Sequence, residues 1–95
     1  MIEGKTKSGF TFAVSEKLGN DFRFVRAYAR ANGSDATDQL AGAVALAEVV
    51  LGKTGVDRLC DHVAEADGTV PTDAVMRELV EIVQAAGAAD GTVKN

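Results

Sequence analysis

Cys60, Asp61 and His62 place a nucleophile, an acid and a base in three consecutive positions. A Cys/His hydrolase needs its thiol and its imidazole within hydrogen-bond distance of each other. In a helix, side chains two positions apart point roughly 200° away from each other, so Cys60 and His62 would not meet. We therefore interpret Cys60 as a buried core thiol and His62 as a surface or boundary histidine, and we predict no catalytic residue in this segment.

Sites for metals and phosphates are also not indicated. One His and one Cys are too few for a typical zinc site. Asp67-Gly68 resembles part of a calcium loop, but aligning Gly68 with the glycine of that loop puts Val63 and Ala74 at ligand positions. Residues 52–55 lack the upstream glycine and the preceding strand of a P-loop. The sequence predicts no metal, no cofactor and no enzymatic activity.

Two charged stripes remain. Carboxylates become acid and base catalysts through burial or an enforced like-charge pair, and an exposed stripe has neither. A few arginines in an acidic chain are expected to face solvent or to pair with carboxylates. The stripes are Asp57, Asp61 and Glu65 on one expected helix and Arg23, Arg26 and Arg30 on another.

Whole-chain properties narrow the class of protein. A chain of 95 residues suits one domain with one core. Its net charge of -4 makes nucleic acid an unfavourable main partner, because such binding depends on basic side chains. The single cysteine cannot form an internal disulfide. With no signal peptide and no apolar run near the roughly 20 residues of a membrane span, we expect a cytoplasmic protein with no membrane partner.

The residue pattern predicts a mainly α fold with a small N-terminal β-hairpin, and about four helices around one core. Phe10, Phe12 and Val14 alternate with smaller residues as in a strand, and Ser8-Gly9 before them is a turn signal. We expect one domain over 1–87 and a flexible tail over 88–95. Its elements are a hairpin at 2–14 and helices at about 19–31, 36–51, 56–66 and 72–86, with Asn20 or Asp21 capping the first helix and Gly52 ending the second.

Some apolar residues fall outside the expected core faces. Phe22, Val25, Tyr28 and Ala29 share one face of the first helix, and Leu40 and Val44 belong to the core face of the second. Exposed apolar patches often mark interfaces, and small residues let a partner helix approach closely. Burial by another part of the same chain is an equally good explanation. The predicted partner-binding residues, for a client or for self-association, are Phe24, Ala41, Ala45 and Val49.

Several short structural motifs follow one another along the chain. They are the stretch at 5–12, Glu48-Val49-Val50-Leu51-Gly52, Asp67-Gly68-Thr69-Val70, Ala85-Ala86-Gly87 and the Lys94-Asn95 end. In this order the motifs resemble those of the tail assembly chaperones of long-tailed bacteriophages and related prophages, and the resemblance extends from Lys5 to about Asn95.

The resemblance implies a function in virion assembly. Such chaperones bind the long tape measure protein and keep it soluble while tail tube protein polymerises around it. The resemblance therefore implies the tape measure protein as partner, with tail tube protein as a further one, in the cytoplasm of the host cell and not in the mature virion. The alternative from another class is a small regulatory or structural protein, such as a helix-turn-helix module built from the first two helices, which would bind DNA with a steep salt dependence.

Overall fold

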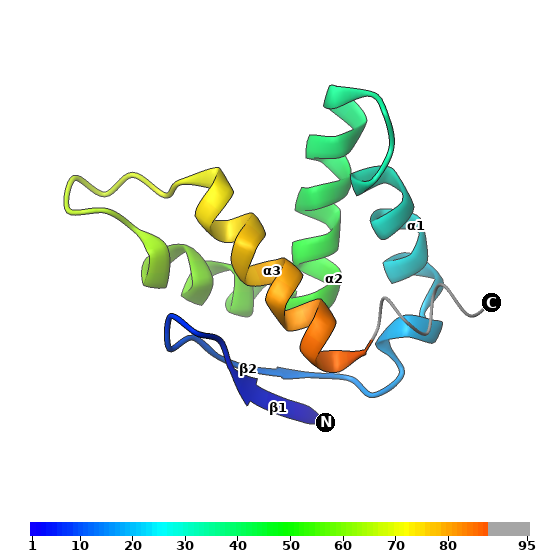
Figure 1. Cartoon of the computed structure of the whole chain (residues 1–95), viewed down its shortest axis with the longest axis horizontal. Coiled ribbons are helices and arrows are strands. Elements are labelled where there is room, and N and C mark those ends of the chain that lie inside the picture. The colour runs from blue at the N-terminus through cyan, green and yellow to red at the C-terminus, as the bar shows by residue number, and fades with distance from the viewer. Residues whose placement is uncertain (88–95) are drawn as a thin grey trace.

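The computed structural model describes residues 1–87, so the tail expected at 88–95 lies outside the described residues. The described part is an N-terminal hairpin followed by helices, which confirms the predicted α+β class (Figure 1). The order is β1 (Ile2–Lys5), β2 (Thr11–Val14), a 3-10 turn η1 (Leu18–Asn20), α1 (Phe22–Ala31), α2 (Ala36–Val63) and α3 (Thr72–Ala86).

The β-hairpin is confirmed. β1 and β2 pair antiparallel, with Ile2 opposite Val14 and Gly4 opposite Phe12. At the turn, Gly9 takes a φ of 96°, a conformation that glycine adopts without steric cost, and its N–H donates to the carbonyl of Thr6 at 2.9 Å. The alternating apolar side chains of the second strand are buried, so the hairpin is held by its apolar face packing under the helices.

α1 begins at Phe22, three residues later than expected, because residues 18–20 form a 3-10 turn instead. Asp21 is the N-cap, and its carboxylate accepts from the backbone N–H of Arg23 at 2.9 Å. The core face of α1 differs from the expected one. Phe24 and Ala27 are buried, whereas Phe22 is 73% exposed. The helix is therefore rotated relative to the prediction, with Phe24 turned inward.

α2 replaces two of the four expected helices, so the described residues contain three helices. Gly52 was correctly predicted as the end of a helical run: its φ of 72° and ψ of 168° are non-helical, and the axis turns there (Figure 1). Helix resumes directly after Gly52, without the linker expected at 53–55. This second part of α2 ends at Val63 rather than at residue 66. The two parts are called the first arm (36–51) and the second arm (53–63).

α1 and the first arm pack closely. A Cβ atom placed on Gly42 would lie 2.3 Å from the backbone nitrogen of Ala31, so only glycine allows this approach. The short connection between them places Asp35 as N-cap of α2, where its side chain accepts from the N–H of Thr37 at 2.9 Å. α1 therefore lies alongside the first arm.

α3 follows a loop in which Asp67 accepts from the N–H of Thr69 at 2.9 Å and Gly68 takes a φ of 89°. That local bond lowers the pKa of the Asp67 carboxyl. Asp67 and Gly68 therefore form a turn between the second arm of α2 and α3. Pro71 precedes the first helical residue, Thr72, and the helix ends at Gly87 with a φ of 69°.

One apolar core joins all elements. It holds the hairpin's apolar face, Leu18, the inner face of α1, both arms of α2 and α3. Its most buried members are Val14, Phe24, Leu59, Leu79 and Ile82.

By length and composition, α2 is a candidate membrane span, with a mean hydropathy of 1.3 over its most apolar window. The core helix of a soluble protein meets the same criterion. The kink at Gly52 divides the helix into two arms, each shorter than the roughly 20 residues that cross a bilayer as a straight helix. Both arms contribute buried residues to the core. No observation tests the expectation of no membrane partner, which stays a prediction.

Candidate protein-binding surface

The four predicted contact residues are not brought together on one exposed face. Phe24 is 0% exposed and stacks on Tyr28, with ring centroids 5.6 Å apart. It is a core residue and offers no surface to a partner in this conformation. Ala41, Ala45 and Val49 are half-buried, and Ala45 and Val49 line a groove between the first arm and α1.

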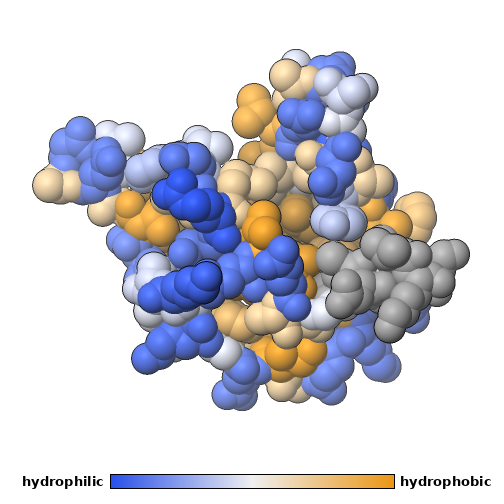
Figure 2. Space-filling model, viewed as in Figure 1, coloured by the Kyte–Doolittle hydropathy of each residue, from blue (hydrophilic) through white to orange (hydrophobic). Residues whose placement is uncertain are grey.

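The exposed apolar side chains lie elsewhere. Leu40 is 61% exposed and Val44 is 62% exposed, although both were expected to be in the core. They are one helical turn apart on the first arm, and Figure 2 shows apolar surface around this part of the molecule. The sequence indicated that some apolar side chains of the first arm would stay exposed, because this arm is apolar on nearly all sides. Choosing the covered side required knowing where α1 packs.

Leu40 and Val44 border an open apolar groove of about 240 Å³ between the two arms of α2 and the start of α3. Small side chains from the first arm contribute to its lining, which brings the helix backbone close to any occupant. Its lining residues are Leu40, Ala43, Val44, Ala47, Glu48, Val56, Cys60, Val70, Thr72, Val75, Met76 and Leu79. This set of residues is called the α2–α3 groove.

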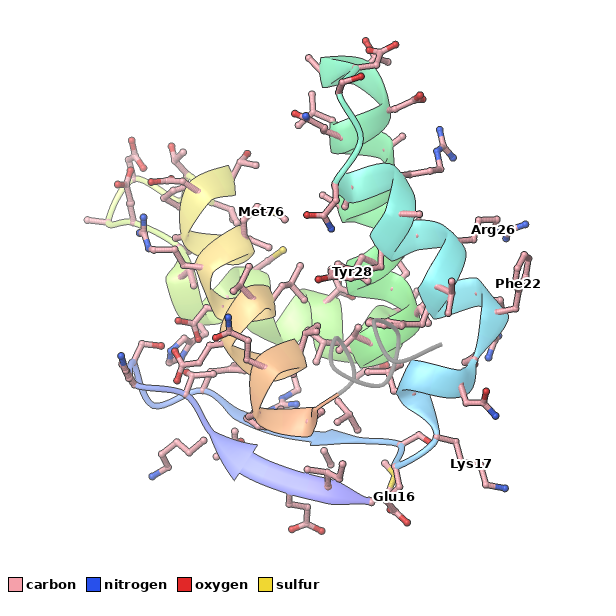
Figure 3. All side chains as sticks on the ribbon, turned by 45° about the vertical axis from the view of Figure 1, so that its right-hand side comes forward. Glu16, Lys17, Phe22, Arg26, Tyr28 and Met76 are labelled. Atoms are coloured by element: carbon pink, nitrogen blue, oxygen red, sulfur yellow. The ribbon has the colours of Figure 1, made fainter. Side chains whose placement is uncertain are left out.

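A neighbouring groove of about 250 Å³ opens between α1 and α3. Tyr28 of α1 and Met76 of α3 both border it, and Figure 3 shows them on facing elements. Met76 and Leu79 line both grooves, and Val80, which borders the second, is exposed. Apolar surface thus continues around α3.

The residue types that first suggested hydrolase chemistry lie on different surfaces. Cys60 is half-buried, rather than fully buried as expected, and lines the α2–α3 groove. His62 is exposed and lines a shallow depression with Phe10 and Arg58; its ring lies 5.5 Å from that of Phe10. A thiol and an imidazole separated in this way do not form a Cys/His pair.

His62 instead meets the hairpin turn. Its Nε2 lies 2.9 Å from Ser8 Oγ, and Ser8 donates to Glu78 Oε1 at 3.0 Å. In a hydrolytic triad the carboxylate would orient the imidazole through its other nitrogen. Here Glu78 accepts from the serine itself and from Thr6, so the cluster is a polar junction that fastens the hairpin to α3. The sequence pattern could not have revealed it, because its members come from three distant segments.

The arginine stripe lines a third groove, of about 460 Å³, between α1 and the first arm. Arg23 pairs with Asp21 at 2.8 Å, and Arg30 pairs with Asp38 at 3.3 Å, so neither uses the acidic stripe of the second arm. Hydrogen bonds between Arg23 and Asp21 lower the pKa of the aspartate and raise that of the arginine. This α1–α2 groove is lined by Arg23, Arg26, Ala27, Arg30, Ala45, Glu48 and Val49.

Within residues 1–87, no group of three or more His, Cys, Asp or Glu side chains is arranged to hold a metal ion. No protein-family profile, no curated protein and no solved structure matches this chain. The class that the fold and the surface define is therefore a small α+β domain with open apolar grooves.

Proposed function

We propose that this protein is a non-enzymatic binding protein that holds an apolar helix of a client in the α2–α3 groove. The observation that supports this proposal most strongly is the exposure of Leu40 and Val44 beside the groove. Burying a large aliphatic side chain completely stabilises a protein by on the order of 1.5–3 kcal/mol relative to leaving it exposed to water. Leu40 and Val44 lack most of this stabilisation while they are exposed. A partner that covers them gains part of that energy on binding.

The lining favours a helix as the occupant. Leu40 and Val44 are four residues apart and present a ridge, while Ala43 and Ala47 leave room for close approach. Helix-in-groove recognition works through apolar anchors with this spacing. Glu48 and Thr72 at the groove border would orient polar groups of the occupant.

The specific client that we propose is the tape measure protein of a long-tailed phage or prophage, with the chain acting as a tail assembly chaperone in the host cytoplasm. This identification rests on the resemblance of the motifs at 5–12, 48–52 and 67–70. A long protein with apolar helical segments needs such cover until tube protein displaces it. The net charge of -4 would help to keep the complex soluble.

The helix-turn-helix alternative has less support. The exposed side of the first arm carries Leu40 and Val44, which cannot hydrogen-bond base edges. Two of the three arginines of α1 are paired with aspartates. A DNA-binding protein would lose affinity steeply as salt rises, and the proposed chaperone should show no DNA binding at all.

Co-expression with the tape measure protein of the same phage or prophage tests the proposal. We expect the soluble fraction of that protein to rise and the two proteins to co-elute. Leu40→Glu and Val44→Glu should abolish both effects, because a carboxylate would then have to be buried against the client. Phe22→Glu is the matched control, since it also replaces an exposed apolar side chain, but outside the groove. An insoluble tape measure protein without a complex, or equal loss in all three variants, would contradict the proposal.

Cys60 provides a second readout, because it is the only cysteine of the chain and lines the groove. We expect the client to slow the reaction of this thiol with a maleimide or disulfide reagent. A complex in which the thiol reacts as fast as in the free protein would place the client on another surface.

A further inference from the structure

The α1–α2 groove has walls of opposite charge. α1 supplies Arg23, Arg26 and Arg30 to one wall and has no acidic residue among its ten positions. The first arm supplies Glu48 to the groove, along with Ala45 and Val49. Together with Ala27, these two apolar residues form a floor of small side chains between charged walls.

The three arginines of α1 differ in whether they form an ion pair. Arg23 and Arg30 already have aspartate partners at the two ends of α1. Among residues 1–87, Arg26 and Glu48 make no ion pair within 4.0 Å. Figure 3 shows Arg26 projecting from the outer side of α1, near the exposed Phe22. Arg26 is thus the guanidinium of this groove that is open to a new partner.

We infer that the α1–α2 groove is a second protein-binding site, and that it takes an amphipathic helix with small apolar residues on its inner face, carboxylates on one flank and a basic residue on the other. The arginines recur at intervals of three and four residues, so carboxylates with the same spacing on a partner helix could face them along the wall. Glu48 would face the basic flank of the partner helix. This pairing of opposite charges on both walls also sets the direction in which the helix runs along the groove.

The lining favours a protein partner over a nucleic acid. An apolar floor of Ala27, Ala45 and Val49 suits a helix face, and Glu48 would repel phosphates. The floor residues Ala27, Ala45 and Val49 do not line the proposed client groove, although Glu48 borders both grooves. The inference therefore stands whether or not the client is a tape measure protein.

A pair of synthetic peptides of about 16 residues, long enough to form helix on binding, tests the site. Both carry the same Ala/Val face. The first has Glu on one flank and Lys on the other, and the second has Lys on both flanks, so that it faces the arginines with Lys in either direction. We expect titration by fluorescence anisotropy to show that the first binds at least about fivefold more tightly at low salt, with the difference shrinking as salt rises.

Variants of the protein then locate the binding. Arg26→Glu should weaken binding of the first peptide at least about fivefold and should reduce its advantage over the second peptide. Arg77→Glu, an equivalent change on α3 outside the groove, is the control and should leave binding unchanged. Leu40→Glu should also leave it unchanged, which separates this site from the proposed client groove.

Several results would overturn the inference. These are equal binding of both peptides, no binding at about 1 mM peptide, or loss of binding in Arg77→Glu as large as in Arg26→Glu. Sedimentation showing a dimer that Arg26→Glu dissociates would assign the groove to a second copy of the chain instead. Tighter binding of an oligonucleotide than of the first peptide would assign it to nucleic acid.

Discussion

The hydroxyl of Thr6 donates a hydrogen bond to Glu78 Oε1 at 2.6 Å, across a separation of 72 residues. Thr6 is buried and Glu78 is only 8% exposed, so this bond is largely shielded from water. Close by, the N–H of Lys7 donates to Glu81 Oε2 at 2.8 Å. The hairpin turn is therefore fixed to α3 by polar contacts in addition to its apolar face.

Thr6→Val should destabilise the protein by about 1–3 kcal/mol, because it leaves the buried Glu78 carboxylate with one donor fewer and removes the acceptor of the Phe10 N–H. Chemical denaturation gives the change in the free energy of unfolding. Thr54→Val, at an exposed position of α2, is the control. A loss no larger than that of the control would mean that the bond contributes nothing to stability.

Gly42→Ala should lower stability by about 1–3 kcal/mol, because the new methyl group would collide with the backbone at Ala31. The sign of this change is diagnostic. The same substitution at an open helical site usually raises stability by about 0.4–1 kcal/mol. A Tm at or above that of the wild type would show that α1 and the first arm do not approach closely here.

Gly52→Ala should cost about 1–3 kcal/mol through backbone strain alone, since a Cβ atom at this position would meet nothing within 4 Å. Gly52→Asn should cost about as much, because Asn tolerates positive φ mainly in the left-handed helical region, and the ψ of 168° at Gly52 lies outside it. Thermal unfolding of both variants against the wild type measures the cost. An Ala variant as stable as the wild type would argue against this backbone conformation at the kink.

Phe24→Ala should destabilise the protein by about 3–5 kcal/mol, as expected for a large side chain removed from a core. Any loss of client binding in this variant would then follow from unfolding, whereas Leu40→Glu should lose binding and retain the wild-type circular dichroism spectrum. If Phe24→Ala unfolds with the wild-type midpoint, the placement of Phe24 in the core is wrong.

Asp21→Asn should remove a stability increment that depends on pH. The pKa of Asp21 in the folded protein is lowered from 3.8 by its hydrogen bonds with Arg23, so its contribution is present above that value and is lost as pH falls through the folded pKa. The Tm difference between the wild type and Asp21→Asn should therefore be largest near neutral pH and shrink below pH 3.8. A difference that stays constant down to pH 2 would contradict this linkage.

Sequence patterns predicted features that depend on a few neighbouring residues. The hairpin followed from the alternation of Phe10, Phe12 and Val14 beside a glycine turn, and the break at Gly52 followed from glycine after an apolar run. Asp21 was named as a possible cap for the same local reason. The number of helices was overestimated because Lys53-Thr54-Gly55 reads as a linker, whereas helical hydrogen bonding restarts immediately after the kink.

The location of the binding surface was less accessible to the sequence. Phe24 was expected to be surplus on α1 and is in the core, while Leu40 and Val44 were expected in the core and are exposed. All three lie on helices with more apolar residues than one face can hold. Periodicity shows that such a helix must be covered, but it does not show on which side.

By itself, then, the sequence determined the fold class, the hairpin, a cap at Asn20 or Asp21 and the site of the kink, because turn geometry, capping and strand alternation act over a few residues. The tertiary structure alone decided which apolar residues are covered, that Cys60 and His62 lie on separate surfaces, and that Thr6 meets Glu78. These outcomes depend on how α1 and α3 pack against the two arms of α2, which is settled by contacts between residues far apart in the chain.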